Sequence, residues 1–240
     1  MLYPSINLEQ YDALDANAEM FKASALAAAP LGRALAEATC FVSINRFERK
    51  KNIALALKAF ASLRAMLNDA AGAAGAAGAG GFKQLCLIIA GGYDARVAEN
   101  VEYYKELEAE AIALGLGEQV LFKASFSEAE RAALLTQSAA VVYTPSDEHF
   151  GIVPLEAMYC RRPVIAVNSG GPTESIVHEQ TGILCDATPE AFAEAMRRVL
   201  EDAGAARAMG QRGRERVAEH FSLAAFAVRL HEIVSQVHVQ

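Results

Sequence analysis

Residues 143–174 read YTPSDEHFGIVPLEAMYCRRPVIAVNSGGPTE. The pattern predicts a strand that ends at Thr144, a polar loop, a helix over 153–159, a second strand over 163–167 and a second polar loop. A strand, a helix and a strand in this order are typical of a parallel sheet. Both polar loops then lie at the carboxyl edge of the sheet, where ligands bind in such folds.

The same alternation of apolar strand and helix extends over most of the chain. The run QLCLIIA at 84–90 is almost continuously apolar, as expected for a parallel strand that is covered by helices on both faces. We therefore predict an α/β fold with a doubly wound, Rossmann-like parallel sheet of six strands. The predicted strands are 39–44, 84–90, 119–123, 139–144, 163–167 and 182–185, and the predicted helices are 53–67, 94–116, one that Ser127 caps with Glu130 in a capping box, 153–159, 189–201, 205–220 and 223–237.

The expected organisation is one domain with flanking segments. Residues 1–36 are interpreted as a linker of irregular structure, and 37–220 as the α/β domain. The Ala- and Gly-rich stretch at 69–81 has no hydrophobic face and is expected to be a flexible insertion. Residues 221–240 are expected to form a helix that packs toward an N-terminal domain, which this sequence lacks.

Composition and charge limit the possible functions. Hydrophobic residues make up 53% of the 240 positions, which is enough for a packed core. The formal net charge of −7 argues against a nucleic-acid partner, because phosphate contacts favour basic patches. We find no signal peptide and no run of about 18 or more apolar residues that could cross a bilayer. On its own, this chain is therefore expected to be soluble.

The four cysteines lie far apart and form no C-x-x-C pair. Cys40 and Cys86 fall within apolar, strand-like runs, so we expect buried, reduced thiols and a reducing compartment.

A cationic loop follows the first predicted strand. Arg46, Arg49, Lys50 and Lys51 lie within six residues, at the head of a predicted helix. Cations at a helix N-terminus favour a diphosphate and could offset the negative charge that develops on a leaving phosphate. The alternative is a solvated basic turn.

Two glutamates flank the first polar loop. Glu148 and Glu156 are eight residues apart, with Gly151 between them, so that carboxylates and free helix N–H groups could bind sugar hydroxyls. Glu102 and Glu110 share this spacing in a stretch that is predicted to be a solvated helix, so the spacing alone carries little weight. The alternative is a capped, solvated helix start.

Two glycine pairs end predicted strands. Gly170-Gly171 and Gly91-Gly92 would allow close backbone approach and positive φ, although plain turns are equally consistent with them. For His149, ligand contact and loop packing are equally consistent. The sequence has no dinucleotide fingerprint, P-loop, nucleophile elbow, zinc motif or Asp-x-Asp pair. We therefore expect no metal and no cofactor, with Arg46 and Lys51 neutralising a diphosphate.

Four motifs together resemble the retaining GT-B glycosyltransferases. They are NRFERKKN at 45–52, IIAGGYD at 88–94, YTPSDEHFGIVPLEAM at 143–158 and PVIAVNSGGPTESI at 163–176. The resemblance covers residues 2–199 and is greatest to the eukaryotic α-1,3/1,6-mannosyltransferases of dolichol-linked oligosaccharide assembly. LYPSIN at 2–7 also resembles the passage between the two domains of that family.

The resemblance implies transfer of mannose from GDP-mannose to a lipid-linked oligosaccharide, at the cytosolic face of the endoplasmic reticulum membrane. Residues 37–220 would be the nucleotide-sugar (donor) binding domain. The acceptor would bind an N-terminal domain, and membrane association would need segments that are absent here. By position, Arg46 and Lys51 would hold the diphosphate, Glu148 would face the mannose and Glu156 would bind the ribose. The implied catalytic residues are Glu148, Arg46 and Lys51, and the other implied donor-binding residues are Gly91, Gly92, Phe122, Lys123, Ser125, His149, Phe150, Gly151, Ile152, Val153, Glu156, Gly170 and Gly171.

Two alternatives remain open from the residues themselves. The donor could be another nucleotide sugar, such as UDP- or ADP-glucose, because a carboxylate on the ribose does not identify the base. The chain could also be a non-catalytic subunit or fragment that binds the donor and completes a cleft with a partner.

Overall fold

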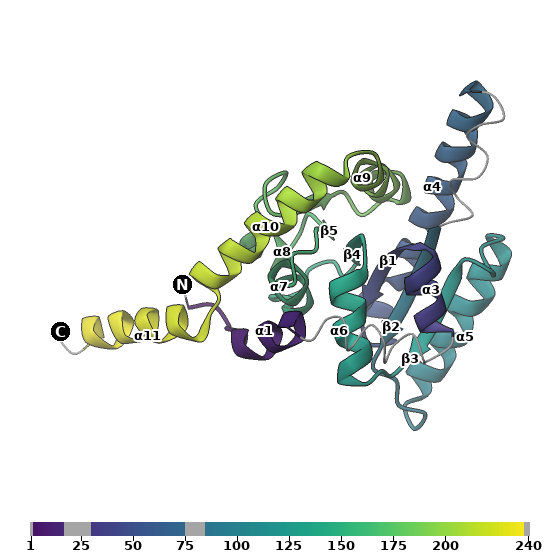
Figure 1. Cartoon of the computed structure of the whole chain (residues 1–240). Coiled ribbons are helices and arrows are strands. Elements are labelled where there is room, and N and C mark those ends of the chain that lie inside the picture. Colours follow the sequence, from purple (N-terminus) through teal and green to yellow (C-terminus); the bar gives the residue numbers. More distant parts are fainter. Residues whose placement is uncertain (1, 17–29, 75–84, 238–240) are drawn as a thin grey trace.

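A computed structural model describes residues 2–16, 30–74 and 85–237 of the chain (Figure 1). In this part of the chain, six parallel strands form one sheet in the order β3-β2-β1-β4-β5-β6. The predicted doubly wound parallel sheet is confirmed. The strands are β1 (Thr39–Ile44), β2 (Leu85–Gly91), β3 (Val120–Ala124), β4 (Ala140–Tyr143), β5 (Val164–Val167) and β6 (Ile183–Cys185).

Helices cover both faces of the sheet, which explains the apolar character of its central strands. All seven residues of β2 are buried. Alternate residues of a strand point to opposite faces, so Phe41 packs in one hydrophobic cluster and Val42 in the other. The first cluster lies against α4 (Ile53–Ala74), α5 (Ala98–Ala113) and α9 (Pro189–Glu201), and the second lies against α1 (Leu8–Ala16), α3 (Leu31–Glu37), α6 (Glu128–Gln137), α7 (Ile152–Tyr159) and α10 (Ala203–His220).

Most predicted helices are found close to their predicted bounds. Helix α9 has the predicted bounds, and so does α11 (Leu223–Val237). Helix α6 begins with the predicted capping box, in which the Ser127 hydroxyl accepts from the Glu130 amide and the Glu130 carboxylate accepts from the Ser127 amide. Helix α10 begins two residues early, because the Asp202 carboxylate caps it by accepting from the Ala205 amide at 2.8 Å.

Several segments differ from the prediction. Leu8–Ala16 is helical rather than irregular, since buried Tyr11 gives it a face that packs on the domain. Helix α4 continues past Leu67 to Ala74, into the low-complexity stretch, because alanine is the strongest helix former. Residues 75–81 of that stretch lie outside the described residues. Helix α5 is shorter than predicted, and the short helices η1 (Arg49–Lys51) and α8 (Pro172–Ser175) were not predicted.

The predicted buried thiols are confirmed, because Cys40, Cys86, Cys160 and Cys185 are all buried and free. In the part of the chain that the structure describes, no helix combines the length and apolarity needed to cross a bilayer. Helix α11 extends away from the sheet, beside the N-terminus (Figure 1). The Ile6 amide donates to the Phe221 carbonyl at 3.0 Å and fixes the N-terminal segment next to the start of α11.

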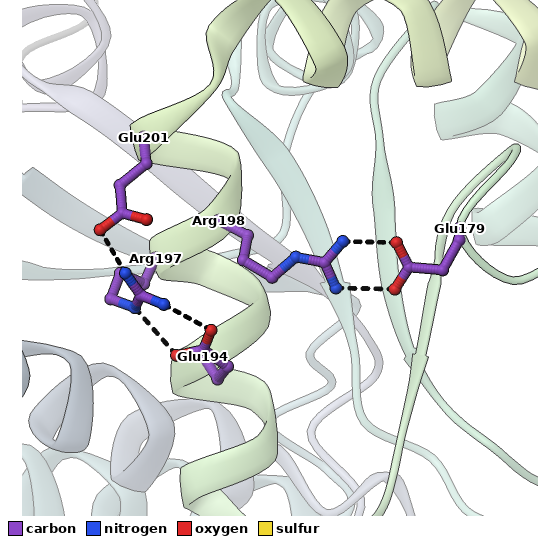
Figure 2. Close-up of polar contacts among 5 residues, drawn as sticks. All are labelled: Glu179, Glu194, Arg197, Arg198 and Glu201. Atoms are coloured by element: carbon purple, nitrogen blue, oxygen red, sulfur yellow. Dashed lines mark hydrogen bonds and ion pairs between the residues drawn. The ribbon is translucent and has the colours of Figure 1, made fainter.

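Helix α9 carries two arginines that pair in different ways. Figure 2 shows Arg197 bound to Glu194 and Glu201 of its own helix, whereas Arg198 reaches Glu179 in the loop before β6. Both guanidinium N–H groups of Arg198 donate to the two oxygens of Glu179, in a bidentate pair. Of these two arginines, Arg198 is the one that connects its helix to another segment of the fold.

Arg198→Ala is expected to lower the free energy of unfolding by about 1 kcal/mol, at the upper end for exposed ion pairs, and Arg197→Ala is expected to lower it by less, because the pairs of Arg197 with Glu194 and Glu201 lie within a single helix. The hydrogen bond from Arg198 lowers the pKa of Glu179 from its ordinary value of 4.5. The Arg198 contribution is therefore complete above about pH 5.5 and is lost as the pH falls through the folded pKa. Urea unfolding of both variants from pH 8 to pH 3.5 measures this, and a pH-independent difference would contradict it.

Candidate functional site

Three loops meet at the carboxyl edge of β1, β4 and β5. The Thr144 hydroxyl, directly after β4, donates to the Lys51 carbonyl at 2.8 Å. The Ser169 hydroxyl, after β5, accepts from the Asp147 amide at 3.0 Å. The Gly171 amide donates to the Glu148 carbonyl at 2.7 Å. The loops that the sequence analysis assigned to this edge are thus joined to one another by hydrogen bonds.

The centre of the site is an ion pair between Lys51 and Glu148. The Lys51 ammonium donates to Glu148 Oε2, and the two residues are 97 positions apart in sequence. Their side chains are 12% and 24% exposed. The Tyr143 hydroxyl lies 3.4 Å from the same carboxylate oxygen. The structure therefore brings together two of the three predicted catalytic residues.

Lys51 and Tyr143 hold the pKa of the Glu148 carboxyl below its ordinary value. Burial alone raises the pKa of Glu148, but the hydrogen bonds and charge of Lys51 and the hydrogen bond from Tyr143 outweigh it, so the pKa lies below its ordinary value. Burial and the Glu148 carboxylate raise the pKa of the Tyr143 phenol. At neutral pH the site thus holds the Glu148 carboxylate and the protonated Tyr143 phenol beside Lys51, and these groups can bind phosphate oxygens and sugar hydroxyls.

The other cations of the predicted loop are directed elsewhere. Arg49 contacts Glu102 and Glu106 of α5, so it ties the loop to a helix. Arg46 lies 3.1 Å from Glu48, and its side chain is 66% exposed. The distance from Lys50 to Glu48 is also 3.1 Å. The third predicted catalytic residue, Arg46, is therefore at the same edge but is paired with Glu48 rather than with Glu148.

Of the two interpretations of the glycine pairs, close backbone approach applies at three positions. A Cβ on Gly171 would lie 2.2 Å from the Phe150 Cα, and one on Gly91 would lie 1.6 Å from the Asn45 carbonyl oxygen. Gly170 has φ of +59°, and its Cβ would lie 2.5 Å from the Glu148 carbonyl oxygen. In each case the close approach is made by a neighbouring loop.

The start of α7 leaves amide groups open. Gly151, with φ of +83°, is its N-cap and provides no side chain, so the first N–H groups of the helix have no side-chain cap. Ile152 is exposed, Val153 is half-buried and His149 is exposed. Phe150 instead stacks on Tyr3, with ring centroids 5.9 Å apart, and its role in the structure is to anchor the loop.

Glu156 is buried, so the alternative of a solvated helix start does not apply to it. Only 4% of the residue is exposed. The Tyr11 hydroxyl donates to its Oε1 atom at 2.6 Å, and Arg131 donates to the same oxygen. Sequence reasoning missed Tyr11 and Arg131 because their partner, Glu156, is distant in sequence. It missed Tyr143 because this residue fits the ordinary apolar pattern of a strand.

The remaining predicted residues lie in β3 or directly after β2 and β3. Lys123 pairs with Glu130 at 2.7 Å, and Phe122 packs on Tyr104 with ring centroids 5.6 Å apart. The Ser125 amide donates to the Gly91 carbonyl at 2.7 Å. Gly92 is exposed beside Arg46. These residues share the edge with the Lys51–Glu148 pair but lie toward the β3 side of the sheet.

Among the described residues, no group of three or more His, Cys, Asp or Glu side chains is arranged to hold a metal ion. The polar chemistry of this edge is provided by lysine, arginine, glutamate, tyrosine and backbone amides.

Comparison with known proteins identifies the family of the chain. Residues 32–216 match the family described as glycosyl transferases group 1. The chain is 44% identical over 239 residues to alpha-1,3/1,6-mannosyltransferase ALG2 of Homo sapiens, which covers 100% of this chain and 53% of that protein. It is 36% identical over 230 residues to the protein of that name from Saccharomyces cerevisiae, covering 82% of this chain and 42% of that protein. The chain spans about half the length of the curated relatives it matches.

Solved structures share the fold. Sucrose-phosphate synthase of Thermosynechococcus elongatus matches with a TM-score of 0.73 and 25% identity, over 99% of this chain and 52% of that chain. The C-terminal domain of a glycosyl transferase group 1 family protein from Francisella tularensis matches with a TM-score of 0.62 and 20% identity, over 78% of this chain and 87% of that chain. The predicted resemblance to glycosyltransferases is confirmed: the chain belongs to the group 1 glycosyl transferase family.

Proposed function

We propose that this chain is the donor-binding half of a mannosyltransferase that transfers mannose from GDP-mannose to a dolichol-diphosphate-linked oligosaccharide, through α-1,3 and α-1,6 linkages. The relatives named alpha-1,3/1,6-mannosyltransferase support the reaction. The observation that carries the donor site is the partly buried Lys51–Glu148 pair at the carboxyl edge of the sheet.

Each group in the site has a proposed role. Lys51 binds the diphosphate and offsets the charge on the leaving phosphate without a metal ion. Glu148 faces the mannose, together with the open amides of Ile152 and Val153. Arg46 is exposed and reaches the diphosphate by leaving Glu48. Glu156 accepts from the ribose, and the residues at the end of β3 surround the base.

We propose that a second domain supplies the acceptor site and docks against α11. Helix α11 exposes Leu223, Val228 and Val234, at 66%, 61% and 46%. A hollow of about 690 Å³ lies between Tyr3, the end of α10 and the start of α11. Exposed apolar side chains beside a hollow favour a protein contact. The cytosolic face of the endoplasmic reticulum membrane is the proposed location.

Isothermal titration of the 240-residue chain with GDP and GDP-mannose tests the proposal. We expect binding with a Kd below 1 mM, unchanged by EDTA or Mg²⁺. UDP and ADP under the same conditions test the alternative donors, and tighter binding of either would contradict the assignment of guanine. No binding at millimolar ligand, with the fold intact by circular dichroism, would overturn the donor-binding role.

A further inference from the structure

The Glu156 carboxylate is held by side chains from two other elements. Tyr11 of α1 donates to Oε1 at 2.6 Å, and a guanidinium N–H of Arg131 of α6 donates to the same atom. The side chains of Arg131 and Glu156 are 21% and 5% exposed. Moving a carboxylate out of water is costly unless it is paired and hydrogen-bonded. We call these two donors the Glu156 clamp, because their hydrogen bonds and the charge of Arg131 offset the cost of burying the carboxylate.

The two oxygens of the Glu156 carboxylate differ in their hydrogen bonds. Both donors use Oε1, whereas Oε2 is buried and has no hydrogen-bond partner among the described residues. Buried polar atoms in proteins nearly always have a partner, and an exception calls for an explanation. An acceptor atom without a partner, next to a loop that holds other sugar- and phosphate-binding groups, is suited to a hydroxyl group of a ligand.

We propose that Tyr11 and Arg131 are positioning residues of the donor site. By holding Oε1, they orient Oε2 to accept a hydrogen bond from a ribose hydroxyl of the nucleoside diphosphate. This inference rests on the proposed function, in which Glu156 contacts the ribose. Because Oε2 is closed to water in this structure, the hydroxyl reaches it only when a neighbouring side chain moves, and the clamp keeps the carboxylate in place during that movement.

The placement of Tyr11 is fixed by its neighbours in α1. Asp12 accepts from the Tyr159 hydroxyl at 2.9 Å and also from Arg214. Gln10 donates to Glu128 at 3.4 Å. Helix α1 is thus attached to α6, α7 and α10. This attachment places the Tyr11 side chain against Glu156, which is 145 positions away in the sequence. An N-terminal segment that the sequence presents as a linker therefore completes a pocket formed by the middle of the chain.

The chemistry of the clamp is stable at neutral pH. Burial and the negative charge of Glu156 raise the pKa of the Tyr11 phenol, so it remains a hydrogen-bond donor. Burial alone would lower the pKa of Arg131, but the charge and hydrogen bond of Glu156 outweigh burial and raise it. Both groups therefore donate throughout the pH range in which a nucleotide would bind.

The test compares ribose and dideoxyribose ligands on matched variants of the full 240-residue chain. Titration calorimetry gives the Kd of GDP and 2′,3′-dideoxy-GDP, and the UDP pair is measured as well, so that an incorrect base assignment leaves the ribose comparison intact. The unmodified chain is expected to bind the ribose form about tenfold more tightly, as for one hydrogen bond to a charged group. The ratio of the dideoxy-GDP Kd to the GDP Kd is expected to fall to about three in Tyr11→Phe and to about one in Arg131→Met.

Tyr103→Phe is the matched control, because it also removes a single hydroxyl from a buried tyrosine, one that accepts from the Ala54 amide at 3.3 Å and does not contact Glu156. It is expected to keep the tenfold ratio of the two dissociation constants. If Tyr11→Phe and Arg131→Met also keep this ratio, or if Tyr103→Phe lowers it equally, the positioning role is overturned. If Arg131→Met does not fold, Tyr11→Phe decides alone, since it removes a single hydroxyl.

Failure of the inference and failure of the proposed function give different results. A chain that binds GDP without preferring ribose retains the donor site but loses the role of Glu156 and its clamp. A folded chain that binds neither GDP nor UDP loses the proposed function itself.

Discussion

Lys51→Ala is expected to weaken GDP binding about 30-fold while changing guanosine binding less than about twofold. A hydrogen bond between an ammonium and a phosphate oxygen contributes about 2 kcal/mol, which corresponds to this factor. The substitution also leaves Glu148 without its cationic partner, and its carboxylate then opposes an incoming diphosphate. Guanosine carries no phosphate, so its affinity should be unaffected by the loss of the ammonium group and by the unpaired carboxylate. Titration calorimetry measures GDP, and ligand-observed NMR measures guanosine.

Lys50→Ala is the matched control for this prediction. Lys50 is the adjacent residue, carries the same charge and has a side chain that is 68% exposed and lies 3.1 Å from Glu48. A general loss of positive charge would weaken GDP equally in both variants, whereas a specific contact would weaken it only in Lys51→Ala. Equal losses for GDP and guanosine in Lys51→Ala would contradict a phosphate-binding role, because they would show damage to the fold of the site.

Gly171→Ala is expected to lower the free energy of unfolding by about 3 kcal/mol and to reduce GDP binding more than tenfold. Gly171 has φ of −53° and ψ of −37°, a conformation that alanine adopts readily, so no backbone strain is involved. The added Cβ would instead lie 2.2 Å from the Phe150 Cα and carbonyl oxygen. Backbone atoms cannot move aside as a flexible side chain does. The loss of stability is therefore expected at the upper end of the range that overpacking substitutions cause.

The loss of binding follows from the position of the clash. Phe150 and Glu148 share one loop, and moving that loop displaces the Glu148 carboxylate from Lys51. Gly117→Ala serves as the control, because a Cβ there meets no atom within 4 Å. That variant should unfold at the same or slightly higher denaturant concentration, since alanine restricts the unfolded chain. An unchanged midpoint for Gly171→Ala would show that the two loops are not packed as described.

The order of strands and helices could be predicted from local patterns. The apolar run of β2 is buried along its whole length, and the capping box of α6 forms as its four residues suggest. These features depend on residues close together in sequence. Helix α1 was missed because its stabilising contacts are made by Tyr11 and Asp12 with α7 and α10, and a local pattern contains no record of those partners.

The candidate site divides in the same way. The sequence by itself determined that a parallel sheet exists and that polar loops follow its strands, because hydrophobic periodicity and backbone preference are local properties. The need for Gly170 and Gly171 emerged from the tertiary structure, since the atoms that a Cβ would meet belong to the loop with Glu148 and Phe150. Only the tertiary structure decided that Lys51 meets Glu148 while Arg49 turns to α5. It alone placed Tyr11 and Arg131 on Glu156. The partner of a charged side chain depends on how segments far apart in the sequence pack, and residue spacing carries no information about that packing.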